Sequence, residues 1–225
     1  MNDGEILLDA ELVGDPDAIR ELGAAPPLEL LTDEDITGSR ILIVKRDRGL
    51  QKPRDGGGAM VELDCAFQPA EGTRFVSGRV TVQIVQPQGV MFIDIAPTEI
   101  KEPVKVTYSL EPSGKISLGL GKLSIEPSVS AKRQLEYDSF TCRVKGSGAG
   151  SLRAIWDFAE DNILKQGIGA HQALAVTVPA SDTVRAELLV KATLAKNGLF
   201  GAARDLVLGR TRDERVRDIT LYKAG

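Results

Sequence analysis

Histidine, cysteine and aromatic residues are scarce in this 225-residue chain, and each shortage argues against a class of function. The one histidine, His171, leaves a serine or cysteine triad a single possible base. One histidine and two distant cysteines do not complete a typical structural zinc site. Aromatic residues make up 4% of the chain, which disfavours binding surfaces built from stacked aromatic platforms. We therefore predict no enzyme activity and no catalytic, metal-binding or cofactor-binding residues.

Long apolar runs are also missing. No stretch approaches the ~18 apolar residues of a membrane-spanning helix. The apolar residues 6–8 are too short for the core of a secretion signal, and no basic segment precedes them. Cys65 and Cys142 lie in different strand-like segments, so we expect two buried thiols, although their pairing stays open. Together these features predict a cytoplasmic protein without stable membrane insertion.

Negative charge is concentrated at the amino-terminal end of the sequence. Residues 1–39 hold eleven acids and one base, Arg20, whereas the remaining 186 residues carry 27 bases and 21 acids. We divide the chain into an acidic, partly apolar arm (residues 1–39) and a body (residues 40–225). The arm is either a solvated leader that folds back on the body or a docking element. Within it, Asp15, Pro16 and Gly23 predict a short capped helix.

The body has the pattern of strands. About ten to twelve β-branched or alternating segments are separated by Gly, Pro and Asp, without the repeated helices of an α/β protein. We predict one large or two packed small units forming an antiparallel β-sandwich, or a partly open barrel, with few short helices. Residues 60–67 alternate as a strand with one buried and one wet face, and residues 90–95 suit a central strand. Residues 151–160 fit a strand or a helix, and we favour the strand.

Four short patterns raise specific chemistry, and each has a simpler interpretation. Residues 146–150 resemble a dinucleotide-binding loop, but Ser151 stands where glycine or alanine is needed, so we expect a hairpin loop. The oxygen-bearing residues 157–162 do not follow the spacing of a calcium loop, so we expect a solvated turn. The tail 210–218 mixes bases with acids and predicts no nucleic-acid binding. His171 is expected in a surface loop.

Residues 115–130 alternate apolar residues with glycine and serine. Membrane-inserting hairpins have this pattern, and so do ordinary half-buried hairpins, which we expect here. A slip of the alternation at Gly121 and Lys122 indicates a bulge or a bend.

These observations favour a non-enzymatic protein-interaction or structural module of a larger assembly. It would bind a protein partner or a second copy of itself through the acidic arm and its β edges. Two alternatives remain. One is a hydrolase that uses a carboxylate pair. The other is a β-rich membrane-acting protein, whose binding to lipid vesicles would depend on residues 115–130.

Overall fold

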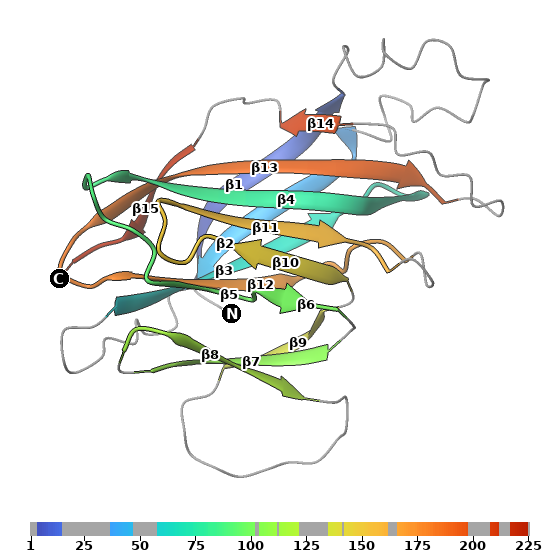
Figure 1. Ribbon diagram of the computed structural model, residues 1–225. Coiled ribbons are helices and arrows are strands. Elements are labelled where there is room, and N and C mark those ends of the chain that lie inside the picture. Colours follow the sequence, from blue (N-terminus) through green and yellow to red (C-terminus); the bar gives the residue numbers. More distant parts are fainter. Residues whose placement is uncertain are drawn as a thin grey trace.

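The computed structural model describes residues 4–14, 37–46, 58–101, 104–111, 113–121, 135–140, 142–161, 166–197, 208–211 and 217–224. Within these ranges every element is a strand, and the fifteen strands form a 12-stranded and a 3-stranded antiparallel sheet (Figure 1). The mainly β, antiparallel fold predicted from the sequence is confirmed. The short helix predicted after Asp15 lies outside the described residues.

The strands are β1 (Gly4–Gly14), β2 (Arg40–Arg46), β3 (Gly58–Gln68), β4 (Thr73–Gln86), β5 (Asp94–Ala96), β6 (Glu99–Ile100), β7 (Val104–Leu110), β8 (Ile116–Gly121), β9 (Leu135–Phe140), β10 (Arg143–Ser147), β11 (Arg153–Ala159), β12 (Gln172–Pro179), β13 (Val184–Lys196), β14 (Leu208–Thr211) and β15 (Arg217–Tyr222).

The large sheet folds back on itself to form two layers. Its strand order is β5-β12-β3-β2-β1-β14-β13-β4-β11-β10-β6, with β15 beside β13. Strands from β5 to β1 make one layer, strands from β14 to β6 make the other, and the layers are joined where β1 pairs with β14. At the opposite end of the strand order, the chain connects one layer to the other, because β5 of the first layer is followed directly by β6 of the second.

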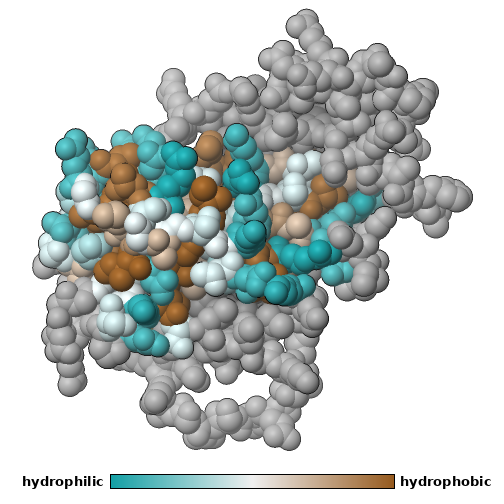
Figure 2. Space-filling view, viewed as in Figure 1, coloured by the Kyte–Doolittle hydropathy of each residue, from teal (hydrophilic) through white to brown (hydrophobic). Residues whose placement is uncertain are grey.

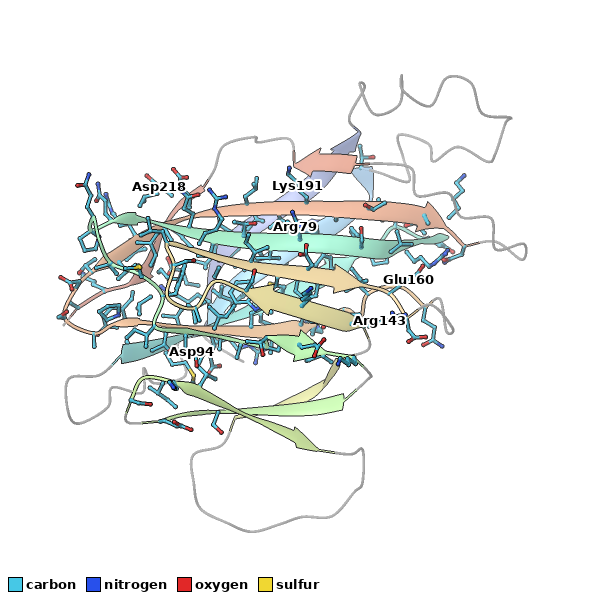
Figure 3. The ribbon with its side chains drawn as sticks, in the orientation of Figure 1. Arg79, Asp94, Arg143, Glu160, Lys191 and Asp218 are labelled. Atoms are coloured by element: carbon cyan, nitrogen blue, oxygen red, sulfur yellow. The ribbon has the colours of Figure 1, made fainter. Side chains whose placement is uncertain are left out.

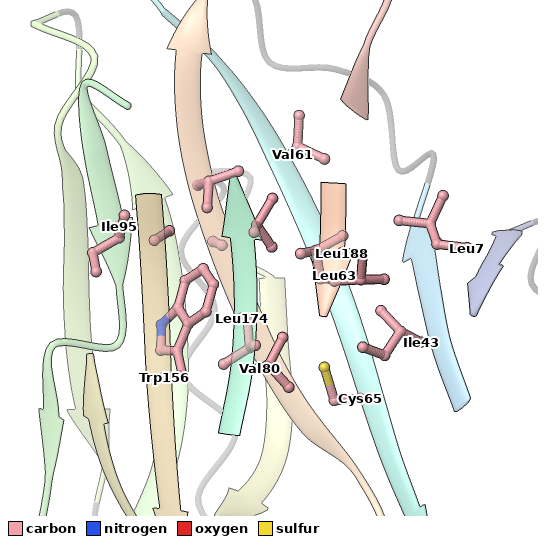
Figure 4. Packing of buried hydrophobic residues seen from close by; sticks show 14 of the residues in the cluster. Leu7, Ile43, Val61, Leu63, Cys65, Val80, Ile95, Trp156, Leu174 and Leu188 are labelled. Carbon is pink, nitrogen blue, oxygen red and sulfur yellow. The ribbon is translucent and has the colours of Figure 1, made fainter. Parts of the chain in front are cut away.

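Alternating apolar residues from both layers form the core (Figure 4). Trp156 on β11 and Leu174 on β12 are fully buried. The ring of Phe67 packs edge-on against Phe75 and Phe158, with ring centroids 5.4 Å apart in both pairs. Such aromatic contacts contribute beyond the area that they bury. The period-two alternation that predicted strands therefore supplies the side chains that hold the layers together.

The prediction that one face of the segment 60–67 is exposed to solvent is wrong. Glu62 and Asp64 on β3 are buried, as are Met60 and Ala66 on the same side of the strand. Asp64 forms an ion pair with Arg46 on the neighbouring β2, and this pairing compensates for the loss of water around the carboxylate. Alternation in the sequence indicates which positions are polar. It does not indicate whether a polar face is covered by other parts of the chain, as it is for this strand.

The prediction of a central strand at residues 90–95 is also wrong. Only Asp94–Ala96 form a strand, the short β5 at one end of the sheet order. The reason lies in where the backbone hydrogen bonds go. The amide of Phe92 donates to Ser151 O next to β11, and the amide of Ile93 donates to Thr177 O on β12. This segment thus bridges the two layers instead of extending along one of them.

Two further predictions fall on described residues. The ambiguous segment 151–160 contains the strand β11, as favoured. Residues 4–14 of the acidic segment form β1, where Asp9 pairs with Arg40 and Glu5 pairs with Lys45, both on β2. The division of the chain at residue 39 stays a prediction.

Removing the central aromatic contact should destabilise the whole sandwich. We expect Phe67→Ala to lower the free energy of unfolding by about 3–5 kcal/mol, because it deletes a buried ring and leaves a cavity. Urea unfolding followed by tryptophan fluorescence measures this change. Leu152→Ala, which truncates an exposed side chain, should change the stability by less than about 0.5 kcal/mol. A loss for Phe67→Ala no larger than that of the control would contradict the two-layer core.

Candidate functional site

The 3-stranded sheet β8-β7-β9 is amphipathic in its register. Every cross-strand pair that contains a large apolar residue joins it to another apolar residue. These pairs are Val106–Leu120, Tyr108–Leu118, Leu110–Ile116, Tyr108–Leu135, Val106–Tyr137 and Val104–Phe140. The remaining pairs join Lys, Thr, Ser, Glu and Gly, such as Ser109–Ser117 and Thr107–Glu136. Because directly opposed residues of antiparallel strands share a face, the register gathers the apolar residues on one face.

An irregularity in β9 preserves this arrangement. A strict alternation from Leu135 and Tyr137 would continue at Ser139 and leave Phe140 on the polar face. The register shifts between the pairs Val106–Tyr137 and Val104–Phe140, so that β9 advances by three residues where β7 advances by two. One extra residue in a strand is a β-bulge. Here the bulge pairs Phe140 with the apolar Val104 in the register.

The amphipathic sheet is attached to the main sheet through β5. It lies beside the edge where β5 and β12 run, and β8 is the strand that meets them (Figures 1 and 3). The carboxylate of Asp94 accepts hydrogen bonds from the amide of Ile95 (2.9 Å) and, with its other oxygen, from the amide of Ile116 at the start of β8 (2.7 Å). Sequence reasoning missed Asp94. The signal was a lone carboxylate inside the apolar run 90–95.

The turn between β7 and β8 also meets the body. Gly114 has a φ of 80°, and a Cβ atom added there would lie 3.2 Å from the amide nitrogen of Gly58 and 3.3 Å from the side chain of Ile93. Leu110 and Ile116, on either side of the turn, pack against the hydrophobic core. Glycine therefore suits this position for both its conformation and its lack of a side chain.

The residues that suggested catalysis or metal binding do not form one site. His171 is exposed in the loop before β12, as predicted, with its Nδ1 atom 3.5 Å from Asp64 Oδ1. Asp157 on β11 binds Arg79 (2.5 Å), and Glu160 binds Arg74 (3.0 Å) and the amide of Gly167 (3.1 Å). These carboxylates are engaged in ion pairs and add no geometry for a hydrolase.

The described residues hold no gathering of three or more His, Cys, Asp or Glu side chains that would suit a metal ion. Asn162 and the basic stretch 212–216 lie outside the described residues. Residues 146–150 belong to the hairpin that joins the antiparallel strands β10 and β11, as predicted, so no helix follows this glycine-rich turn. In none of the described ranges is there a helix long and apolar enough to span a lipid bilayer.

Both cysteines are buried free thiols, as predicted. Burial raises the pKa of the Cys142 thiol to about 12, and its Sγ donates a weak hydrogen bond to Gln172 Oε1 at 3.4 Å. Burial also raises the pKa of Cys65, and the charge of the neighbouring Asp64 adds to this effect. Since the thiolate is the nucleophilic form, neither cysteine is built for covalent catalysis.

This conclusion has a direct chemical test. In the native protein we expect both thiols to react with an aromatic disulfide reagent at least about 100-fold more slowly than in the unfolded chain at about pH 8, because they are buried and protonated. Absorbance of the released thiolate measures the rates. Guanidinium-unfolded protein serves as the control, in which two thiols per chain should react. Fast modification of the folded protein would show an accessible thiolate.

Removal of the Asp94 carboxylate should loosen the amphipathic sheet without unfolding the sandwich. In Asp94→Ala we expect amide hydrogen exchange at Ile116 to accelerate by about tenfold, which corresponds to one lost hydrogen bond. Asp94→Asn, which keeps one carbonyl acceptor, should show a smaller change. The matched control is Asp157→Ala, which removes the same charge from β11. Unchanged exchange at Ile116 would mean that Asp94 does not anchor the sheet.

Comparisons with known proteins give similarity in structure only. No protein-family model matches the sequence, and no curated protein matches it. Among solved structures, the chain is similar to the delta-toxin of Clostridium perfringens (11% identity, 75% of this chain and 80% of that one, TM-score 0.41). It is also similar to the NetB toxin of Clostridium perfringens in its membrane-inserted form (9% identity, 77% and 85% coverage, TM-score 0.31). A third similar structure, from Parabacteroides merdae, belongs to the family DUF4466 (15% identity, 72% and 44% coverage, TM-score 0.30).

These findings correct four predictions made from the sequence. Two of the similar structures are toxins, and one of them is in a membrane-inserted form. Four predictions are wrong when compared with these two structures. They are a structural or protein-interaction module, a cytoplasmic location, docking through the acidic arm, and no stable membrane insertion. The alternation in residues 115–130 is compatible with an ordinary hairpin and with a membrane-inserting one, so the pattern alone did not separate the two functions. The predictions of self-association and of no nucleic-acid binding stay predictions.

Proposed function

We propose that this chain is a non-enzymatic, membrane-acting protein that contacts lipid through the sheet β8-β7-β9. The observation that carries the proposal is the register of that sheet, which opposes apolar residues to apolar residues across all three strands. A membrane-facing sheet needs this arrangement, because its lipid side must be apolar while the other side stays polar. The bulge in β9 supports the same interpretation, since it restores the apolar register at Phe140.

The residues between the apolar positions form the polar side of the sheet in its register. On β8 they are Ser117, Gly119 and Gly121, and on β7 they include Thr107 and Ser109. The charged residues Lys105 on β7 and Glu136 on β9 stand in the same set of pairs, as expected for the side of the sheet that stays in water. Hydrogen bonds from β8 and β9 pair with backbone N–H and C=O groups of the middle strand β7. An apolar environment requires such pairing, because it offers no water as a partner.

The sheet is also distinct from the main sheet in its pairing. None of its described strands pairs with a strand of the 12-stranded sheet. The hydrogen bond from Ile116 to Asp94 and the packing of Leu110 and Ile116 attach it to the body. At its other end, only residues 101–103 and 141–142 separate β7 from β6 and β9 from β10, so the chain also holds the sheet to the body there. Because the described strands of the two sheets do not pair with each other, the small sheet can change its packing contacts without breaking the pairing of the sandwich.

Substitutions on adjacent residues of β8 separate the two faces. We expect Leu118→Asp to weaken binding to phosphatidylcholine vesicles, and leakage of a trapped dye, by at least about tenfold. A carboxylate on the apolar side costs about 2.5–3.5 kcal/mol at the bilayer centre and less near the surface. Vesicle sedimentation measures binding, and fluorescence dequenching measures leakage.

The matched control is Ser117→Asp, which introduces the same charge one residue earlier, at a position paired with Ser109. We expect this variant to bind within about twofold of the original protein. Circular dichroism and thermal unfolding of both variants verify that the fold is retained. Equal effects of the two substitutions, or no vesicle binding by the unaltered chain, would overturn the proposed function.

A further inference from the structure

Three of the five large apolar side chains that are exposed among the described residues lie in two loops at one end of the sandwich, outside the amphipathic sheet, whereas Ile6 and Leu189 lie on β1 and β13. Met91, Ile93 and Leu152 expose 48%, 36% and 47% of their surfaces, although most large apolar residues described in the body are buried. All three lie in loops: Met91 and Ile93 follow β4, and Leu152 precedes β11. Figure 2 shows apolar residues exposed at the left end of the visible face, where the loop after β4 runs. We call these three residues the loop patch.

Hydrogen bonds hold the two loops together. The amide of Phe92 donates to Ser151 O (2.9 Å), and the amide of Gly150 donates to Phe92 O (2.8 Å). Phe92 itself is fully buried, so its side chain anchors the loop while its neighbours Met91 and Ile93 remain outside. The exposed side chains are thus presented from a fixed backbone.

The loop patch adjoins the turn of the amphipathic sheet. The side chain of Ile93 lies next to Gly114: a Cβ atom added to Gly114 would be 3.3 Å from Ile93 Cγ2. The loop patch and the β7–β8 turn therefore occupy the same end of the molecule (Figure 1). A flat lipid surface that meets this turn meets the loop patch as well.

The charges of the two loops favour lipid as the occupant. Residues 87–93 and 147–153 contain no carboxylate, in a chain with 32 of them, and their one charged residue is the exposed Arg153 beside Leu152. An apolar tip with a flanking cation suits the boundary between acyl chains and phosphate headgroups. Three side chains are also too few for a stable protein interface, which buries roughly 800 Å² on each partner.

We propose that Met91, Ile93 and Leu152 form a second lipid contact, which inserts into the headgroup region of the bilayer next to the amphipathic sheet. This inference rests on the proposed membrane function and adds residues that the function itself does not require. The contact orients the end of the sandwich toward the lipid. This second contact is made by exposed side chains of two hydrogen-bonded loops. It requires no change in strand pairing.

A tryptophan reporter tests the location directly. The native Trp156 is the only tryptophan and is fully buried, so a new tryptophan reports its own surroundings. With vesicles of phosphatidylcholine and a minor fraction of phosphatidylglycerol, we expect the emission of Leu152→Trp to shift to shorter wavelength and to be quenched by brominated acyl chains. The control is Ile6→Trp on β1, which is 55% exposed but several strands away in the sheet order. Its emission should not respond.

A charge variant separates this inference from the proposed function. We expect the double substitution of Met91→Asp and Leu152→Asp to weaken vesicle binding by at least about tenfold, and Ile6→Asp by less than about twofold. If Leu118→Asp abolishes binding while the double variant binds normally, the loop-patch inference is overturned and the proposed function stands. If the unaltered chain binds no vesicles, both fail. Quenching of Ile6→Trp to the same extent as Leu152→Trp would also overturn the inference.

Discussion

The arrangement of this protein depends on burying one apolar face of a long sheet against itself. Twelve strands would expose a large apolar surface if they lay flat, and the fold removes that surface from water by placing β3 and β12 opposite β4 and β11. Trp156, Phe67 and Leu174 fill the space between the layers. The chain crosses from the layer of β4 to that of β5 at residues 87–93 and returns to β6 at residues 97–98. The first crossing carries Met91 and leads into Asp94.

The amphipathic sheet has a different relation to water. Its strands carry as regular an alternation as the strands of the sandwich, but no strand of the main sheet pairs with them in the described residues. Within the described residues, its contacts with the body include the hydrogen bond at Ile116 and the packing of Leu110 and Ile116, and none of them is strand pairing. Contacts of this kind can be exchanged without breaking a ladder of backbone hydrogen bonds, which is what the proposed lipid contact requires.

Sequence patterns predicted the strands well where the pairing did not matter. The alternation in residues 115–130 indicated a strand where the structure has β8, because a half-buried strand needs period two whatever its neighbours are. It failed where the neighbours decide the outcome. Glu62 and Asp64 are buried because Arg46 is close and both faces of β3 are covered, and residues 90–95 bridge two layers because their amides bond to Ser151 and Thr177.

The candidate site was visible in the sequence only in part. The alternation of Ile116, Leu118 and Leu120 was evident, but its two possible interpretations have the same pattern. The pairing of β7 with β9 was needed to show that the apolar face extends over three strands and that a bulge keeps Phe140 in it. Asp94 was not recognised, because the atom that it binds is a backbone amide 22 residues later in the chain.

The length of the strands limits what the amphipathic sheet can do in this conformation. Its longest strand, β7, has seven residues, which extend over about 23 Å at ~3.3 Å per residue. A strand that crosses the ~30 Å hydrocarbon core at a tilt needs about 9–11 residues. Described strands of this length agree with the proposed contact in the lipid interface, with the apolar face toward the acyl chains. Crossing the membrane would require longer strands. Leu123 and Ile125 continue the alternation after the slip at Gly121, but Pro127 occupies the next position of that series, and proline cannot donate a hydrogen bond within a sheet.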